Sequence, residues 1–146
     1  MLFRSSAGVH GVIPFEKTTE ANLLECIANI STHGLPVDNF WVDAGWYTCP
    51  PEASGWDKTT GSWTPDPVRF PNGLRPIAEA AKKCGMDFLL WFEPERVMPK
   101  TWLAENHPDW LLEPADFLPE RKYQKDANFR LLDFGNPAAQ IGRAHV

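Results

Sequence analysis

The fold is decided by a short apolar run that ends in an acid, Asn39-Phe-Trp-Val-Asp43, and by the turn after it, Ala44-Gly-Trp-Tyr47. Aromatic and β-branched residues favour a strand over 39–43, and the polar turn ends it. A second run, Met86–Phe92, is almost continuously apolar and also ends in carboxylates, Glu93-Pro-Glu95. Such a run is typical of a strand buried on both faces in a parallel sheet. We therefore predict two successive strands with polar residues at their carboxyl ends.

Helices are predicted before and between these strands. One covers 19–33, where Thr18 or Thr19 can act as N-cap, and another covers 74–84 with Pro76 in its first turn. Their apolar faces follow helical spacing and consist of Leu23, Leu24, Ile27 and Ile30 in the first and Leu74, Ile77, Ala78 and Ala81 in the second. Four shorter elements are predicted: a helix over 100–105, an extended piece over 110–112, a strand over 130–133, and a helix starting at Pro137 with Asn136 as N-cap.

This alternation of helices and strands predicts an α/β fold with a parallel sheet and right-handed crossovers. A (β/α)₈ barrel (TIM barrel) needs about 250 residues, so 146 residues would supply its first few β/α units. A doubly wound domain would fit the length, but no glycine-rich nucleotide motif is present. Polar and aromatic residues follow successive strands, including a Pro- and Gly-rich loop over 44–73, and this favours the partial barrel.

Composition excludes several classes of function. The net charge is −5, so no nucleic-acid partner is expected, and no apolar run of about 18 residues predicts a membrane span. With no apolar leader at the start, a cytoplasmic location is expected. The distant cysteines Cys26, Cys49 and Cys84 are expected to be free thiols, and because the four histidines lack ligand spacing, neither metal nor cofactor is predicted.

Carboxylates and tryptophans at the strand ends suggest a site for a polyol. Asp43, with Trp46 beside it, can accept hydrogen bonds from a pair of sugar hydroxyls, or can cap the following loop. Glu93 and Glu95 flank a proline and would point to one side of an extended segment, with Arg96 keeping them ionised. These three residues either bind substrate or anchor their loop through salt bridges.

Five tryptophans fall in or near these segments: Trp46, Trp56, Trp63, Trp91 and Trp102. A flat indole ring can cover the apolar C–H face of a pyranose while carboxylates take its hydroxyls. The alternative is that the rings fill the core, which we expect in part for Trp91 because it lies inside an apolar strand.

At these residues the sequence resembles the melibiase-type α-galactosidases, glycoside hydrolase family thirty-six. The resemblance runs in order over about residues 36–139. It rests on Phe40-Trp-Val-Asp-Ala-Gly-Trp-Tyr47, Gly61-Ser-Trp63, Arg69-Phe-Pro-Asn-Gly-Leu74, Gly85-Met86, Leu90-Trp-Phe-Glu-Pro-Glu-Arg-Val97 and Asn106-His-Pro-Asp-Trp-Leu-Leu112. It implies a (β/α)₈ barrel that hydrolyses terminal α-galactosides with retention, so an α-galactoside oligosaccharide is the expected partner.

The resemblance implies binding roles, residue by residue, for Asp43, Trp46, Trp63, Glu93, Glu95 and Arg96. The family's frequent Asp-Asp-Gly-Trp motif has a second acid where this chain has Ala44, and Ser62 stands where the family usually has Asp. The family's two catalytic aspartates lie further along, one of them in a Lys-Trp-Asp motif that these 146 residues do not contain. No catalytic residue is therefore expected in this chain.

We accordingly interpret 1–140 as an incomplete α-galactosidase catalytic barrel and 141–146 as a non-native tail. The hexapeptide Ile141-Gly-Arg-Ala-His-Val146 matches one reading frame of a common sequencing adapter. Two other hypotheses remain: a stand-alone carbohydrate-binding domain, and a barrel hydrolase for a different sugar. Folding separates the first from the partial barrel, which is expected to aggregate or form a loose globule, whereas a self-contained binder should unfold cooperatively.

Overall fold

The computed structural model describes residues 17–48, 58–113 and 128–140, which divide into two compact units. Unit 1 comprises the described residues of 1–51 and 64–92, and unit 2 comprises those of 52–63 and 93–146. No helix within the described ranges is long and apolar enough to cross a membrane. Both units mix helices and strands, and the described strands form two separate sheets instead of a complete barrel. The interpretation of 141–146 concerns residues outside the described ranges.

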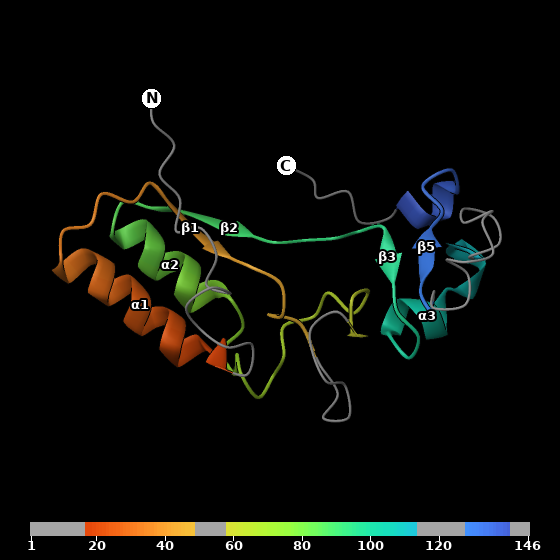
Figure 1. The fold of residues 1–146 in the computed structure, drawn as a ribbon, viewed down its shortest axis with the longest axis horizontal. Coiled ribbons are helices and arrows are strands. Elements are labelled where there is room, and N and C mark those ends of the chain that lie inside the picture. The colour runs from red at the N-terminus through yellow and green to blue at the C-terminus, as the bar shows by residue number, and fades with distance from the viewer. Residues whose placement is uncertain (1–16, 49–57, 114–127, 141–146) are drawn as a thin grey trace. The chain divides into compact units, whose positions relative to one another are not determined.

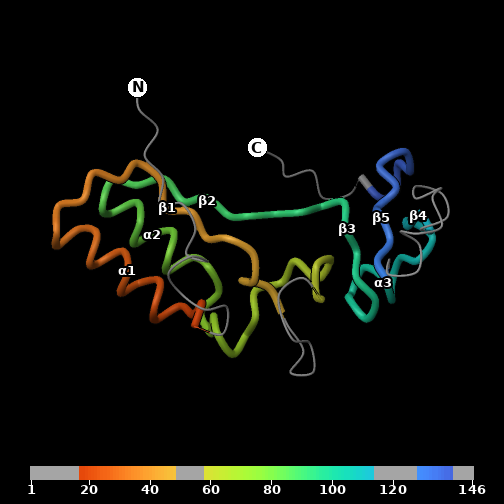
Figure 2. The backbone as a smooth tube through the Cα atoms, in the orientation of Figure 1, coloured from red at the N-terminus to blue at the C-terminus, as the bar shows by residue number. Residues whose placement is uncertain are grey.

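Unit 1 contains a parallel β-α-β arrangement. Strand β1 (Asn39–Val42) leads through helix α2 (Arg75–Lys83) to strand β2 (Asp87–Leu90). The two strands pair in parallel, with Phe40 opposite Phe88. Helix α1 (Glu20–Thr32) precedes β1, and α1 and α2 lie side by side on one side of the sheet (Figures 1 and 2). Both strands and their parallel pairing are confirmed.

The helices of unit 1 begin and end as their sequences predict. Thr19 is the N-cap of α1, and its side chain accepts a hydrogen bond from the Asn22 amide at 3.2 Å. Leu23 and Ile27 are fully buried on one face of α1, and Ile77 and Ala81 on one face of α2. Apolar spacing therefore identifies the faces that pack in the core.

Strand β2 is less buried than its sequence predicts. Leu89 is 44% exposed, Phe88 and Leu90 are half-buried, and Phe92 beyond the strand is 50% exposed. Among the described strands β2 pairs only with β1, and the helices of the unit lie on one side of this sheet. The expectation of burial on both faces was therefore wrong for the described structure, since the helices of unit 1 cover one side of the sheet and Leu89 is exposed.

The thiols of Cys26 and Cys84 are free, as expected, while Cys49 lies outside the described residues. Burial raises the pKa of the Cys26 thiol above its usual value, and the neighbouring Glu25 carboxylate adds to this shift. A raised pKa leaves less thiolate at neutral pH, so Cys26 is expected to react more slowly than an ordinary exposed thiol.

Unit 2 is built from short elements. Strands β3 (Arg96–Val97), β4 (Leu111–Leu112) and β5 (Arg130–Leu132) form a three-stranded sheet with β5 in the centre. Helix α3 (Trp102–Asn106) and the single turns η4 (Pro108–Trp110) and η5 (Pro137–Gln140) complete it. The His107 ring stacks on Trp110 with centroids 3.7 Å apart, which gives this histidine a packing role.

The sheet of unit 2 is antiparallel, so the prediction of a purely parallel sheet was wrong here. In the β4–β5 register Leu112 lies opposite Leu131, and the next pair along is Glu113 and Arg130, joined by an ion pair of 2.9 Å. Opposite charges directly across two strands stabilise that antiparallel register. The order of helices and strands along a sequence does not reveal such a pairing.

Helix α3 starts two residues later than predicted. Lys100 has a left-handed φ of 62°, which is incompatible with a right-handed helix, and the helix instead begins after Thr101. The Thr101 side chain accepts a hydrogen bond from the Ala104 amide at 3.4 Å and so serves as the N-cap. The predicted cap at Asn136 is confirmed, since its side chain accepts from the Ala138 amide at 3.0 Å.

Gly61 is the most constrained described glycine. Its φ is 112°, and a Cβ there would lie 3.1 Å from Thr101 Oγ1 and 3.2 Å from a Val97 methyl group. Gly34 has a φ of 59° with nothing within 4 Å of its would-be Cβ. These two positions separate the effect of backbone conformation from that of crowding.

Replacing Gly61 with alanine should lower the free energy of unfolding of unit 2 by about 2 kcal/mol. The added methyl group would clash with its neighbours, and alanine disfavours a positive φ. We expect amide hydrogen exchange over 96–104, measured by mass spectrometry on the full-length protein that contains this segment, to speed up more than about tenfold while exchange in α1 is unchanged. Gly34→Ala is the control and should cost about 1 kcal/mol, confined to the end of α1. Equal effects of both substitutions would contradict this account.

Candidate functional site

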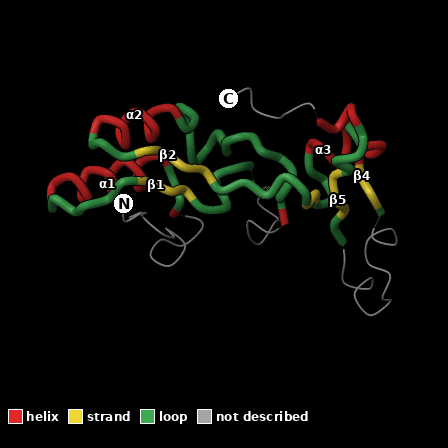
Figure 3. The backbone as a smooth tube through the Cα atoms, turned by 90° about the horizontal axis from the view of Figure 1, so that it is seen from above, coloured by secondary structure: helices red, strands yellow, loops and turns green. Residues whose placement is uncertain are grey.

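The carboxyl-end edge of the β1–β2 sheet carries the first group of candidate site residues. Because the strands are parallel, both end at the same edge, and the chain continues from each as a loop (Figure 3). The Trp91 amide donates to the Val42 carbonyl at 2.8 Å, and the Trp91 carbonyl accepts from the Trp46 indole N–H at 2.8 Å. Trp91 thus ties the turn after β1 to the end of β2.

Asp43 is half-buried directly after β1. Its Oδ1 accepts a hydrogen bond from the Ala44 amide at 2.7 Å, which fixes the orientation of the carboxylate. Ala44 is only 2% exposed, and Gly45 beyond it has a φ of 98°, a conformation that favours glycine. The strand end therefore presents one ordered carboxylate, where the resemblance would place two acids.

In the described structure the Trp46 side chain is buried, so its ring has no exposed face on which a sugar could stack. It is 4% exposed, and its ring meets Tyr47 edge to face with centroids 5.5 Å apart. Both its indole N–H and its main chain are engaged, since the Asp66 amide donates to the Trp46 carbonyl at 3.1 Å. Contact of Trp46 with a sugar stays a prediction.

A short turn over Asp66–Arg69 holds the other side of this loop. Asp66 Oδ1 accepts hydrogen bonds from the amides of Val68 at 2.9 Å and Arg69 at 3.1 Å. The Asp66 side chain therefore stabilises the turn through its backbone amides. The Arg69 guanidinium donates to the main-chain carbonyls of Gly45 at 2.6 Å and Tyr47 at 2.9 Å. We assigned Arg69 no role from its residue type, although it begins the Arg69-Phe-Pro-Asn-Gly motif, which was the available signal.

The same motif is bound to the start of α1. The buried Glu20 carboxylate accepts from the Asn72 amide at 3.0 Å and from the Asn72 side chain at 2.9 Å. The Glu20 amide in turn donates to the Arg69 carbonyl at 2.8 Å. Helix α1 therefore supports the turn that contacts the loop after β1.

In unit 2 the two glutamates predicted to bind sugar differ in their burial and in their side-chain contacts. Glu93 and Arg96 form a half-buried ion pair of 2.6 Å, while the Glu95 side chain is exposed and its main-chain carbonyl accepts from the Leu132 amide at 2.7 Å. Arg96 lies beside Glu93 as expected. This pairing alone fits both original hypotheses, a substrate-binding segment and a loop anchor.

Trp63, also in unit 2, is half-buried and has a φ of 36°. A bulky residue rarely adopts a left-handed conformation, and such strain is found disproportionately at functional positions. Of the other tryptophans, Trp102 is 58% exposed, Trp91 is half-buried and Trp56 lies outside the described residues.

The expected sugar-binding residues divide between the units and are described within each: Asp43 and Trp46 in unit 1, and Trp63, Glu93, Glu95 and Arg96 in unit 2. Unit 2 also contains a cavity of about 320 Å³ lined in part by Val97, Glu105 and Arg130, and none of the six residues lines it. In the part of the chain that the structure describes, no three His, Cys, Asp or Glu side chains are grouped to hold a metal ion.

Comparisons with known proteins identify the family. The model of the melibiase family matches residues 14–141. α-Galactosidase 2 of Pediococcus pentosaceus is 38% identical over 87 residues, which are 60% of this chain and 12% of that protein. The α-galactosidase of Escherichia coli is 35% identical over 99 residues, covering 66% of this chain and 13% of the relative.

A solved structure agrees with these sequences. A variant of the family thirty-six α-galactosidase AgaA of Geobacillus stearothermophilus, crystallised with raffinose, matches with a TM-score of 0.65 at 26% identity. The match covers 84% of this chain and 16% of AgaA. The chain thus spans less than a fifth of the length of these relatives. The family model covers most of the chain, the relatives and the solved structure are α-galactosidases, and the chain belongs to the melibiase family.

Proposed function

We propose that these residues are the first few β/α units of the (β/α)₈ catalytic barrel of a retaining α-galactosidase. They would supply part of the pocket for the terminal galactose, and the nucleophile and the acid/base would come from later in the barrel. The expected substrates are α-galactoside oligosaccharides. AgaA was crystallised with raffinose and stachyose, which supports this substrate class.

One observation carries the proposal: an ordered carboxylate, Asp43, stands at the carboxyl end of a parallel strand, beside the end of a second. Active sites of (β/α)₈ barrels lie at this end of the strands. A carboxylate can accept hydrogen bonds from two hydroxyls of one sugar, and bonds to a charged acceptor contribute about 1.5–3 kcal/mol each. Asp43 is accordingly assigned to galactose hydroxyls.

Segment 93–96, within unit 2, contains three more of the residues to which the resemblance gives a sugar-binding role. The Glu93–Arg96 ion pair fixes the geometry of both groups, and Glu95 is open to solvent. Charged groups of fixed orientation suit sugar hydroxyls, which both donate and accept. A retaining glycosidase needs two carboxyl groups about 5–5.5 Å apart for the reaction itself, and we assign neither of these glutamates to that pair.

Ala44 favours one alternative, a barrel hydrolase for a different sugar. Its methyl group is buried where the resemblance places a second hydroxyl-binding acid. Losing one charged acceptor would weaken recognition of the hydroxyl that it binds in relatives, and a sugar that lacks this hydroxyl or orients it differently would suffer less. Ala44 does not favour the other alternative, a stand-alone carbohydrate-binding domain.

The proposal is tested by expressing two proteins, the full-length protein that contains this segment and the 146-residue chain. The full-length protein should hydrolyse p-nitrophenyl α-galactoside and release α-galactose first, as seen by proton NMR, because the reaction retains configuration. The isolated chain should show only background turnover. Turnover by the isolated chain would refute the absence of catalytic residues, and preference for another aryl glycoside would support the alternative sugar.

Asp43→Asn in the full-length protein should lower kcat/KM by about 10- to 100-fold, because the amide keeps the shape of the side chain but removes its charge. Asp87→Asn is the matched control. Asp87 is an exposed acid at the start of β2, at the opposite edge of the same sheet, and its substitution should leave kcat/KM within about twofold. If the two variants behave alike, Asp43 does not bind substrate.

A further inference from the structure

We propose that Arg69 is a positioning residue for the turn over 43–47, which it holds through main-chain carbonyls without touching substrate. This inference rests on the proposed function, since it takes Asp43 as a sugar-binding residue. It adds Arg69 as a residue that affects substrate binding without contacting the sugar.

The turn over Asp66–Arg69 binds three consecutive carbonyls of the loop after β1. The Arg69 guanidinium donates from Nη1 to Gly45 at 2.6 Å and from Nη2 to Tyr47 at 2.9 Å. The Asp66 amide donates to the carbonyl between them, that of Trp46, at 3.1 Å. Three successive carbonyls are therefore fixed by one short turn, and the first of them lies two residues after Asp43.

Arg69 is itself held in place. Its side chain and that of Asp66 are only 13% and 11% exposed and form an ion pair of 3.4 Å. The guanidinium also donates to the Thr18 carbonyl at 3.4 Å, just before α1. A planar guanidinium can serve several carbonyls at fixed angles, whereas the lysine ammonium is a point charge on a flexible stem.

This arrangement orders the turn before substrate arrives. Gly45 has a φ of 98°, and a flexible turn of this kind would otherwise lose conformational entropy when it binds a sugar. With its carbonyls fixed, the turn presents the Asp43 carboxylate in one geometry. Loss of the hydrogen bonds from Arg69 to this turn should therefore weaken substrate binding more than it slows the chemical step.

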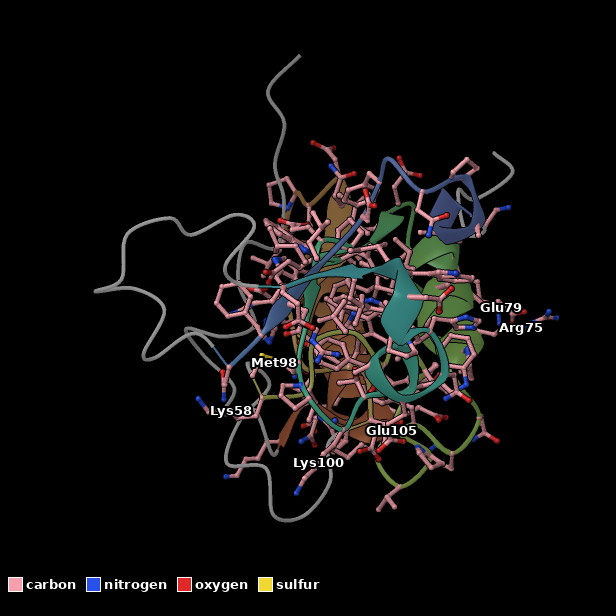
Figure 4. All side chains as sticks on the ribbon, turned by 90° about the vertical axis from the view of Figure 1, so that its right-hand side faces the viewer. Lys58, Arg75, Glu79, Met98, Lys100 and Glu105 are labelled. Atoms are coloured by element: carbon pink, nitrogen blue, oxygen red, sulfur yellow. The ribbon has the colours of Figure 1, made fainter. Side chains whose placement is uncertain are left out.

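The experiment compares Arg69→Lys, Asp66→Asn and Arg75→Lys in the full-length protein, with p-nitrophenyl α-galactoside as substrate and galactose as competitive inhibitor. Arg69→Lys should raise both KM and the galactose inhibition constant about tenfold, with kcat within about threefold. Asp66→Asn leaves the guanidinium in place but removes its ion pair, and both constants should rise about threefold. Arg75 is an exposed arginine that projects away from α2 (Figure 4), and Arg75→Lys should change neither constant.

A merely structural Arg69 would give a different pattern. Its loss would lower the yield or melting temperature of the protein while the folded enzyme kept the wild-type KM, and that result overturns the inference. Where Arg69→Lys fails to fold, an unchanged KM and inhibition constant in Asp66→Asn overturn it equally. A full-length wild type without α-galactosidase activity would refute the proposed function and this inference together, whereas an active wild type with unchanged variants refutes the inference alone.

Discussion

The parallel pairing of β1 and β2 is the constraint on which the rest of unit 1 depends. It places Val42 opposite Leu90, so the two strands end together and the chain leaves both at one edge. Only because of that register can the Trp91 main chain bond both the end of β1 and the Trp46 indole. The helices α1 and α2 bury one side of this pair and hold the register, since a shift by one residue would move every side chain to the opposite face.

The loop after β1 is ordered by hydrogen bonds to its main chain as well as by the burial of Ala44, Trp46 and Tyr47. The turn over Asp66–Arg69 fixes its carbonyls, and Glu20 binds that turn to the start of α1. Such a network lets a loop carry a half-buried acid in a defined orientation without losing access to substrate. Membership of the melibiase family and the position of Asp43 at a strand end both support the proposal that this residue binds sugar.

Local signals in the sequence predicted the elements well, because capping and apolar spacing act within a few residues. The Thr19 cap and the strand over 39–43 are examples. What failed depends on distant partners. The antiparallel direction of β5 follows from its pairing with β4, and the burial of Leu89 depends on which elements pack on its face of β2. The candidate acids could be found from the motifs, whereas the Arg69-Phe-Pro-Asn-Gly motif marks Arg69 without revealing that its guanidinium donates to backbone carbonyls.

The most direct test of the central claim is a crystal structure of the full-length protein with galactose bound. The account predicts that a pair of galactose hydroxyls lies within hydrogen-bond distance of the Asp43 carboxylate, at about 2.5–3.0 Å, with the turn over 43–47 in the conformation described above. Galactose bound at a catalytic centre to which Asp43 makes no contact would contradict the claim that this strand end forms part of the sugar pocket.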